Sequence, residues 1–78
     1  MLRLKLIRKN DLEVVYDYLP EQGDKKGTVT LNITSGEVKN VVSADNDPTE
    51  RYMHRAVSAI IKYYEMGKFP EEDVVAWY

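Results

Sequence analysis

The stretch DPTERYMHRAVSAIIKYYEMG, residues 47–67, decides the fold, because it is the only segment of the chain with a strong helical pattern. At about 100° per residue, its apolar side chains gather on one side and its polar side chains on the other. The apolar side is centred on Ile60 and comprises Met53, Ala56, Val57, Ile60 and Tyr64. We therefore predict one amphipathic helix over about residues 48–66, packed through this side against the rest of the chain.

The residues at the two ends of this stretch agree with the prediction. Asp47 is a good N-cap, Pro48 suits the first helical position, and Glu50 has the spacing of a capping box. Gly67 offers the left-handed conformation that commonly ends a helix. The helix should therefore begin just after Asp47 and end at Gly67.

Outside the helix, apolar and polar residues alternate with a period of two, which is typical of strands with one buried face. The alternation covers about residues 2–8, 12–19, 28–34 and 37–43. Ser35 and Gly36 suit a two-residue hairpin turn between the last two strands. In the fourth strand, the alternation places Val38 and Val42 on one face, with Lys39 and Val41 on the other.

These elements predict an α+β fold for a single domain, residues 1–78. We expect a four-stranded antiparallel meander (β-β-β-β-α), with the helix on one face and the other face in water. If the first two strands pair, Glu13 and Asp17 share a face with Arg3 and Lys5. Proline followed by acids predicts a short C-terminal helical turn or tail over about residues 70–76, because acids interact favourably with the start of a helix dipole.

The composition narrows the class of protein. With 78 residues, 44% hydrophobic and 31% charged, the chain is typical of a small soluble domain with a thin stability margin. The absence of cysteine excludes disulfides and thiolate metal sites, and makes the cytoplasm the default location. No apolar run approaches the roughly 20 residues needed to cross a bilayer, so we expect no membrane contact.

The sequence carries no clear signature of catalysis or of metal binding. His54 is the only histidine, and the chain offers no second histidine or cysteine to converge with it. Asp45, Asn46, Asp47 and Glu50 could supply oxygen ligands, but the glycine and terminal glutamate of an EF-hand loop are missing. We therefore predict no catalytic residue, no cofactor and no metal site.

Aromatic residues are the most informative unusual feature. Six tyrosines and one tryptophan are many for this length, and such residues are enriched at interfaces. The terminal segment could fold back to close the core, or it or an exposed sheet edge could contact another molecule. The candidate interface comprises Phe69, Val74, Val75, Trp77 and Tyr78.

Basic residues supply a second hypothesis. The candidate face for a nucleic acid or an acidic partner comprises Arg3, Lys5, Arg51, His54, Arg55 and Lys62. The net charge of −2 argues against general nucleic-acid affinity. We therefore predict a small non-enzymatic interaction or accessory module that acts through a protein partner or a second copy in a homodimer, with a nucleic-acid-binding module as the alternative.

Overall fold

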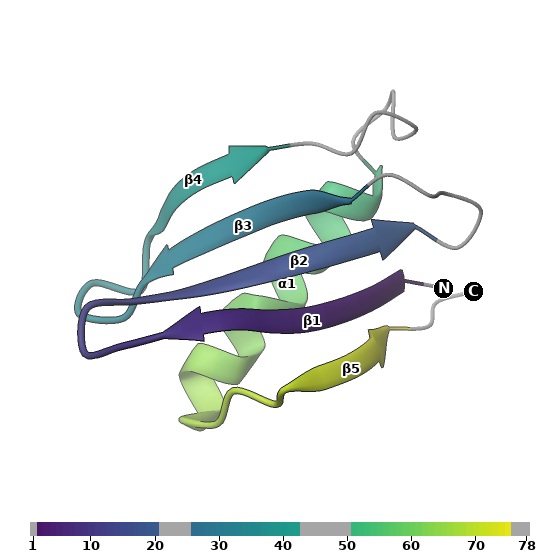
Figure 1. Cartoon of the computed structure of the whole chain (residues 1–78). Helices are drawn as coiled ribbons and strands as arrows, with labels where there is room; N and C mark the ends of the chain where they lie inside the picture. Colours follow the sequence, from purple (N-terminus) through teal and green to yellow (C-terminus); the bar gives the residue numbers. More distant parts are fainter. Residues whose placement is uncertain (1, 21–25, 43–50, 76–78) are drawn as a thin grey trace.

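The computed structural model describes residues 2–20, 26–42 and 51–75. Its elements, in chain order, are β1 (Leu2–Lys9), β2 (Glu13–Pro20), β3 (Gly27–Asn32), β4 (Val38–Val42), α1 (Arg51–Met66) and β5 (Glu72–Val75). The strands form one antiparallel sheet in the order β4-β3-β2-β1-β5, and α1 lies across one face of it (Figure 1). The predicted α+β class and the four-stranded meander are confirmed, and a fifth strand is added at the β1 edge.

The core lies between the sheet and α1. Alternate residues of the first three strands point to this side, as the period-two pattern predicts. The buried apolar residues are Leu2, Leu4, Val14, Tyr16, Tyr18, Val29, Leu31, Ala56, Ile60 and Tyr63. Tyr63 belongs to this core, whereas Tyr64, which the pattern places inward, is half-buried and packs over Gly36. The helix is therefore rotated toward Tyr63 relative to the prediction.

The C-terminal end of α1 follows the predicted glycine stop. Gly67 has a φ of 74°, in the left-handed region that favours glycine. Its N–H donates to the carbonyl of Tyr64 at 3.2 Å, and the N–H of Lys68 donates to the carbonyl of Tyr63 at 3.1 Å. This pair of bonds is the Schellman motif. The predicted capping residues, 47, 48 and 50, lie outside the described residues.

The predicted C-terminal helical turn over residues 70–76 is wrong. Glu72–Val75 instead forms β5, in which Val74 pairs with Arg3 and Glu72 pairs with Lys5 of β1. The N–H of Leu6 also donates to the carbonyl of Glu71 at 2.8 Å. The physical reason is that β1 presents an edge of unpaired backbone groups, and pairing with it satisfies more of them than one isolated helical turn does.

The connection between β1 and β2 is organised by the side chain of Asn10. Its Oδ1 accepts hydrogen bonds from the backbone N–H groups of Leu12 and Glu13, at 2.8 and 2.9 Å. Asparagine commonly stabilises turns in this way. Leu12 therefore lies in the turn with 69% of its surface exposed, and the strand predicted from residue 12 begins at Glu13 instead.

The connection between β3 and β4 is longer than the predicted two-residue turn. Asn32 Oδ1 accepts from the N–H groups of Thr34 and Ser35, at 2.8 and 3.2 Å, and the N–H of Asn32 donates to the carbonyl of Glu37 at 2.8 Å. The third strand therefore ends at Asn32, and the loop spans residues 33–37. Gly36 occupies the left-handed region within it, at a φ of 76°.

A bulge changes the inward face of β4. Val41 pairs with Val29 and Val38 pairs with Leu31, so both valines face the helix, and the extra residue between the pairs is Lys39. Val42, which the alternation places with Val38, is 56% exposed on the opposite face. The predicted face of Val41 and Val42 is therefore wrong, because one inserted residue reverses the alternation beyond it.

The bulge predicts different costs for two neighbouring substitutions. Val41→Ala should lower the free energy of unfolding by about 1 kcal/mol, because it removes methyl groups that pack against the core. Val42→Ala should change it by less than about 0.5 kcal/mol, because its side chain faces solvent. Urea unfolding of both variants measures the difference. A larger loss for Val42→Ala would contradict the bulge.

Candidate interaction surface

The sheet face opposite α1 is called the open face here, because no element of the described part of the chain covers it (Figure 1). It carries the side chains that alternate with the core residues: Arg3, Lys5, Arg8, Glu13, Val15, Asp17, Leu19, Thr28, Thr30, Asn40, Val42, Glu72 and Val74. The predicted sharing of one face by Glu13, Asp17, Arg3 and Lys5 is confirmed.

At the end of the open face near the turns, one acid lies between two bases. Glu13 forms ion pairs with Arg8 of β1 and with Lys39 of β4, the latter at 3.1 Å. The hydrogen bond from Lys39, together with the charges of both bases, lowers the pKa of Glu13. At this end, one carboxylate is therefore shared by two bases.

In the middle of the open face, one base has acids on both neighbouring strands. Lys5 lies between Asp17 on β2 and Glu72 on β5, its direct cross-strand partners. Asp17 Oδ1 in addition accepts a hydrogen bond from Thr28 Oγ1 at 3.1 Å. Opposite charges in cross-strand pairs help to hold the register of a sheet.

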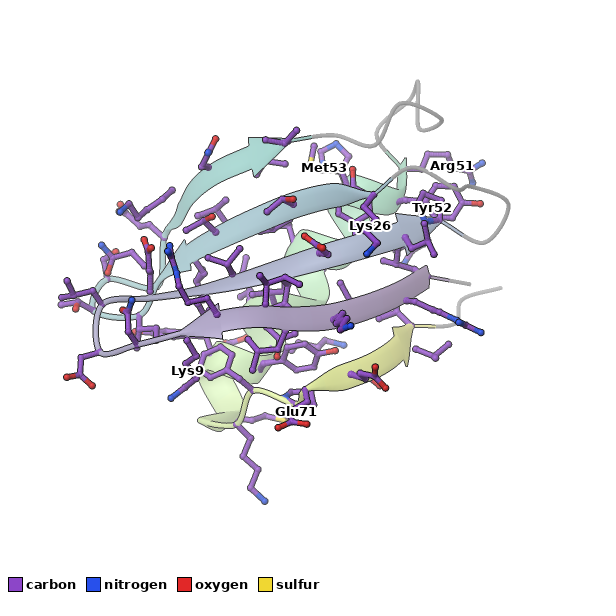
Figure 2. The ribbon with its side chains drawn as sticks, in the orientation of Figure 1. Lys9, Lys26, Arg51, Tyr52, Met53 and Glu71 are labelled. Atoms are coloured by element: carbon purple, nitrogen blue, oxygen red, sulfur yellow. The ribbon has the colours of Figure 1, made fainter. Side chains whose placement is uncertain are left out.

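The remaining end of the open face contains a groove of about 630 Å³ across β5, β1 and β2. It is lined by Arg3, Leu4, Lys5, Asp17, Tyr18, Leu19, Lys26, Glu72, Asp73 and Val74. Arg3 pairs with Leu19 of β2 on one side and with Val74 of β5 on the other. Both cross-strand neighbours of Arg3 are therefore aliphatic. Lys26 precedes β3, and its side chain reaches over β2 on this face (Figure 2).

Two buried tyrosines hold the segment that forms one wall of the groove. Tyr16 Oη donates to the carbonyl of Pro70 at 2.5 Å, and Tyr63 Oη donates to the carboxylate of Asp73. The rings of the two tyrosines lie 5.7 Å apart. Burial and the charge of Asp73 raise the pKa of Tyr16 to about 12, and burial with the hydrogen bond to Asp73 raises the pKa of Tyr63 further. These contacts attach β5 to the core from the helix side.

The predicted interface residues do not form one surface. Val74 is 52% exposed on the open face, whereas Val75 is half-buried and packs against the core. Phe69 is half-buried after α1, with Lys9 Nζ 5.9 Å from its ring centroid. Trp77 and Tyr78 lie outside the described residues. Of the three described members of this set, Val74 lines the groove, whereas Phe69 and Val75 do not.

The predicted basic residues are divided between opposite sides of the molecule. Arg3 and Lys5 are exposed on the open face, whereas α1 carries the exposed set Arg51, His54, Arg55 and Lys62 on its outer side. Figure 1 shows α1 on one face of the sheet, and Arg3 and Lys5 belong to the opposite face. One ligand surface therefore cannot combine them.

No other class of site stands out in the part of the chain that the structure describes. Within residues 2–20, 26–42 and 51–75, no cluster of three or more histidine or acidic side chains could hold a metal ion. The candidate oxygen ligands Asp45, Asn46, Asp47 and Glu50 lie outside these ranges. In the same ranges, no helix has both the length and the apolar character needed to cross a membrane.

Sequence reasoning missed two contributors to the groove, Leu19 and Lys26. The alternation in β2 could have found Leu19, because it continues the face that begins with Glu13 and Asp17. Lys26 falls in the polar connection between strands, where no periodic pattern assigns a face. No protein-family model matches the chain, and neither the curated proteins nor the solved structures contain a match. A functional proposal must therefore rest on the described surfaces of this chain.

Proposed function

We propose that the protein is a small non-enzymatic interaction module that binds a protein partner through its open face. The observation that carries the proposal is the groove, where exposed bases and aliphatic side chains lie together on a sheet face with no described covering element. An antiparallel sheet can leave one face in water, but a hollow lined by both kinds of side chain is typical of a binding surface.

The aliphatic residues favour a protein as the ligand. Val74 and Val42 are each more than half exposed on the open face, and Leu19, which lines the groove with Val74, is half-buried. Apolar side chains bordered by charged ones are the usual composition of a protein interface. A partner would also bury surface that a domain of this size cannot bury by itself.

The alternative of a nucleic-acid-binding module receives less support. Its bases lie on opposite sides of the molecule, and Asp17, Glu72 and Glu13 lie among the bases of the open face. The described aromatic residues pack in the core or on the helix side, so the open face offers no described ring on which a base could stack.

Site-specific photo-crosslinking tests the proposal. We would place p-benzoylphenylalanine at Val74 on the open face and, as a matched control, at Ser58 on the exposed side of α1. In the cells of origin, the Val74 probe is expected to capture one protein, and excess unlabelled chain should suppress the product. The Ser58 probe should capture none, because it faces away from the groove.

Two further outcomes have defined meanings. A product with twice the mass of the chain would identify a second copy as the partner, and light scattering of the purified protein at two salt levels would then show a dimer. Capture from Ser58 and not from Val74 would contradict the proposal, because the partner would then bind α1.

A further inference from the structure

We propose that the partner presents an acidic, extended segment, and that its carboxylate binds between Arg3 and Lys26 at one end of the groove. The inference rests on the proposed function and names the chemistry of the ligand. It starts from the distribution of charge over the open face.

The bases of the open face differ in whether the fold places an acid beside them. Arg8 and Lys39 share Glu13, and Lys5 lies between Asp17 and Glu72. None of Arg3, Lys5 and Lys26 forms an ion pair with any residue that the structure describes, but Lys5 has acids as both cross-strand partners, whereas Arg3 has Leu19 and Val74. Of the three described bases that line the groove, Arg3 and Lys26 are therefore the two that have no described acid as a cross-strand partner.

Among the described residues that line this end of the groove, one further acid, Asp73, already has a hydrogen-bond partner on the helix side. Asp73 borders the groove, but its carboxylate accepts hydrogen bonds from Tyr63 Oη and from the N–H of Val74, the latter at 2.9 Å. Tyr63 lies on the helix side of the sheet. Asp73 is thus held away from Arg3, and an external carboxylate is the complementary group for the two bases.

The walls of the groove favour a peptide segment that carries both acidic and aliphatic side chains. Cross-strand pairing places Arg3 between Leu19 and Val74, so a ligand that pairs with Arg3 would lie close to these aliphatic residues. An extended peptide presents alternate side chains to one face, and can therefore offer a carboxylate and an aliphatic group two residues apart. The volume of about 630 Å³ accommodates a few side chains.

A continuous polyanion fits the same surface less well. A nucleic acid that extends from Arg3 along the open face would place phosphates beside Asp17 and Glu72. Repulsion between these phosphates and the two carboxylates would lower the affinity for a nucleic acid. A segment with spaced carboxylates avoids this repulsion.

The test adds a short synthetic peptide of Ser-Glu-Ser-Val repeats to the full chain. The amide chemical shifts of the protein are measured at each peptide concentration. We expect saturable shifts at Arg3, Leu19 and Val74, and about tenfold weaker binding for each of Arg3→Gln and Lys26→Gln. Lys62→Gln, an exposed substitution on α1, is the matched control and should leave the affinity unchanged. The Ser-Gln-Ser-Val peptide should produce no saturable shifts.

The contrary results distinguish a failure of this inference from a failure of the proposed function. Equal binding of the glutamate and glutamine peptides, or no shifts at all while Val74 crosslinks to a partner, would overturn the acidic ligand and leave the open face as the interface. Tighter binding of a single-stranded oligothymidine than of the glutamate peptide would overturn the choice of a protein ligand. A loss of affinity in Lys62→Gln equal to that in Arg3→Gln would show nonspecific charge attraction and would also overturn the inference.

Discussion

Replacing Gly27 with alanine is expected to remove a large part of the stability of this protein. A Cβ atom at Gly27 would lie 2.2 Å from Cε1 and 2.3 Å from Cζ of Tyr18, its cross-strand partner. The ring of Tyr18 is fully buried, so it cannot move aside without opening the core. Overpacking of this kind costs about 3 kcal/mol or more, against a total of about 4–12 kcal/mol for a domain of this length.

Urea unfolding of Gly27→Ala measures this loss, and Gly67→Ala is the matched control. Gly67 has a positive φ, but a Cβ atom added there would meet no atom within 4 Å, so alanine at this position should cost only about 1 kcal/mol. Adding Tyr18→Leu to Gly27→Ala should cost less than the sum of the single changes, because leucine leaves room for the new methyl group. Equal stability of Gly27→Ala and the parent would contradict the packing of Tyr18 over Gly27.

Alkaline unfolding is the second large expected effect. Tyr16 is fully buried and Tyr63 is 6% exposed, and the fold raises the pKa of both hydroxyls above the ordinary value of 10.0. Above that pH the unfolded chain loses these protons while the folded chain retains them. The stability that they contribute is therefore complete below pH 10 and is lost as pH rises toward 12 and beyond.

The size of this effect is set by the two groups together. Each tyrosine lowers the free energy of unfolding by about 1.4 kcal/mol per pH unit within the window, so the loss at about pH 11 is on the order of 2–3 kcal/mol. Urea unfolding at a series of alkaline pH values measures the slope. Because burial accounts for most of the shift of Tyr16, its share should persist when Asp73 is replaced with asparagine.

Tyr63→Phe is the informative variant for this prediction. It should cost about 1 kcal/mol at neutral pH, where the hydroxyl donates to Asp73, and it should roughly halve the slope above pH 10. A parent protein whose stability stays constant from pH 10 to 12 would show that the fold does not hold these hydroxyls neutral.

Local patterns predicted the parts of the fold that depend on local physics. The period-two alternation identified β1, β2 and β3, because each has one buried face and neighbouring residues point to opposite sides. The same alternation predicted that Arg3 and Lys5 share the open face with Asp17. Gly67 marked the end of α1, because a left-handed residue satisfies the last carbonyls of a helix.

Other features depend on neighbours that a local pattern does not contain. The segment Glu72–Val75 is a strand because the edge of β1 is available to pair with it, although its acids and preceding proline are typical of a helix start. The bulge at Lys39 and the rotation of α1 toward Tyr63 likewise depend on packing between elements. Propensity is a weak predictor wherever such contacts compete with it.

The sequence by itself determined the α+β class, the antiparallel meander, the single covering helix and the sidedness of the first three strands. These follow from periodicity and capping, which act over a few residues along the chain. Only the tertiary structure decided the fifth strand and the groove, because Arg3, Leu19 and Val74 come from three different strands and meet through cross-strand pairing alone. Residues that are distant in sequence become a site when the sheet forms, so the candidate ligand chemistry could be inferred only from the folded chain.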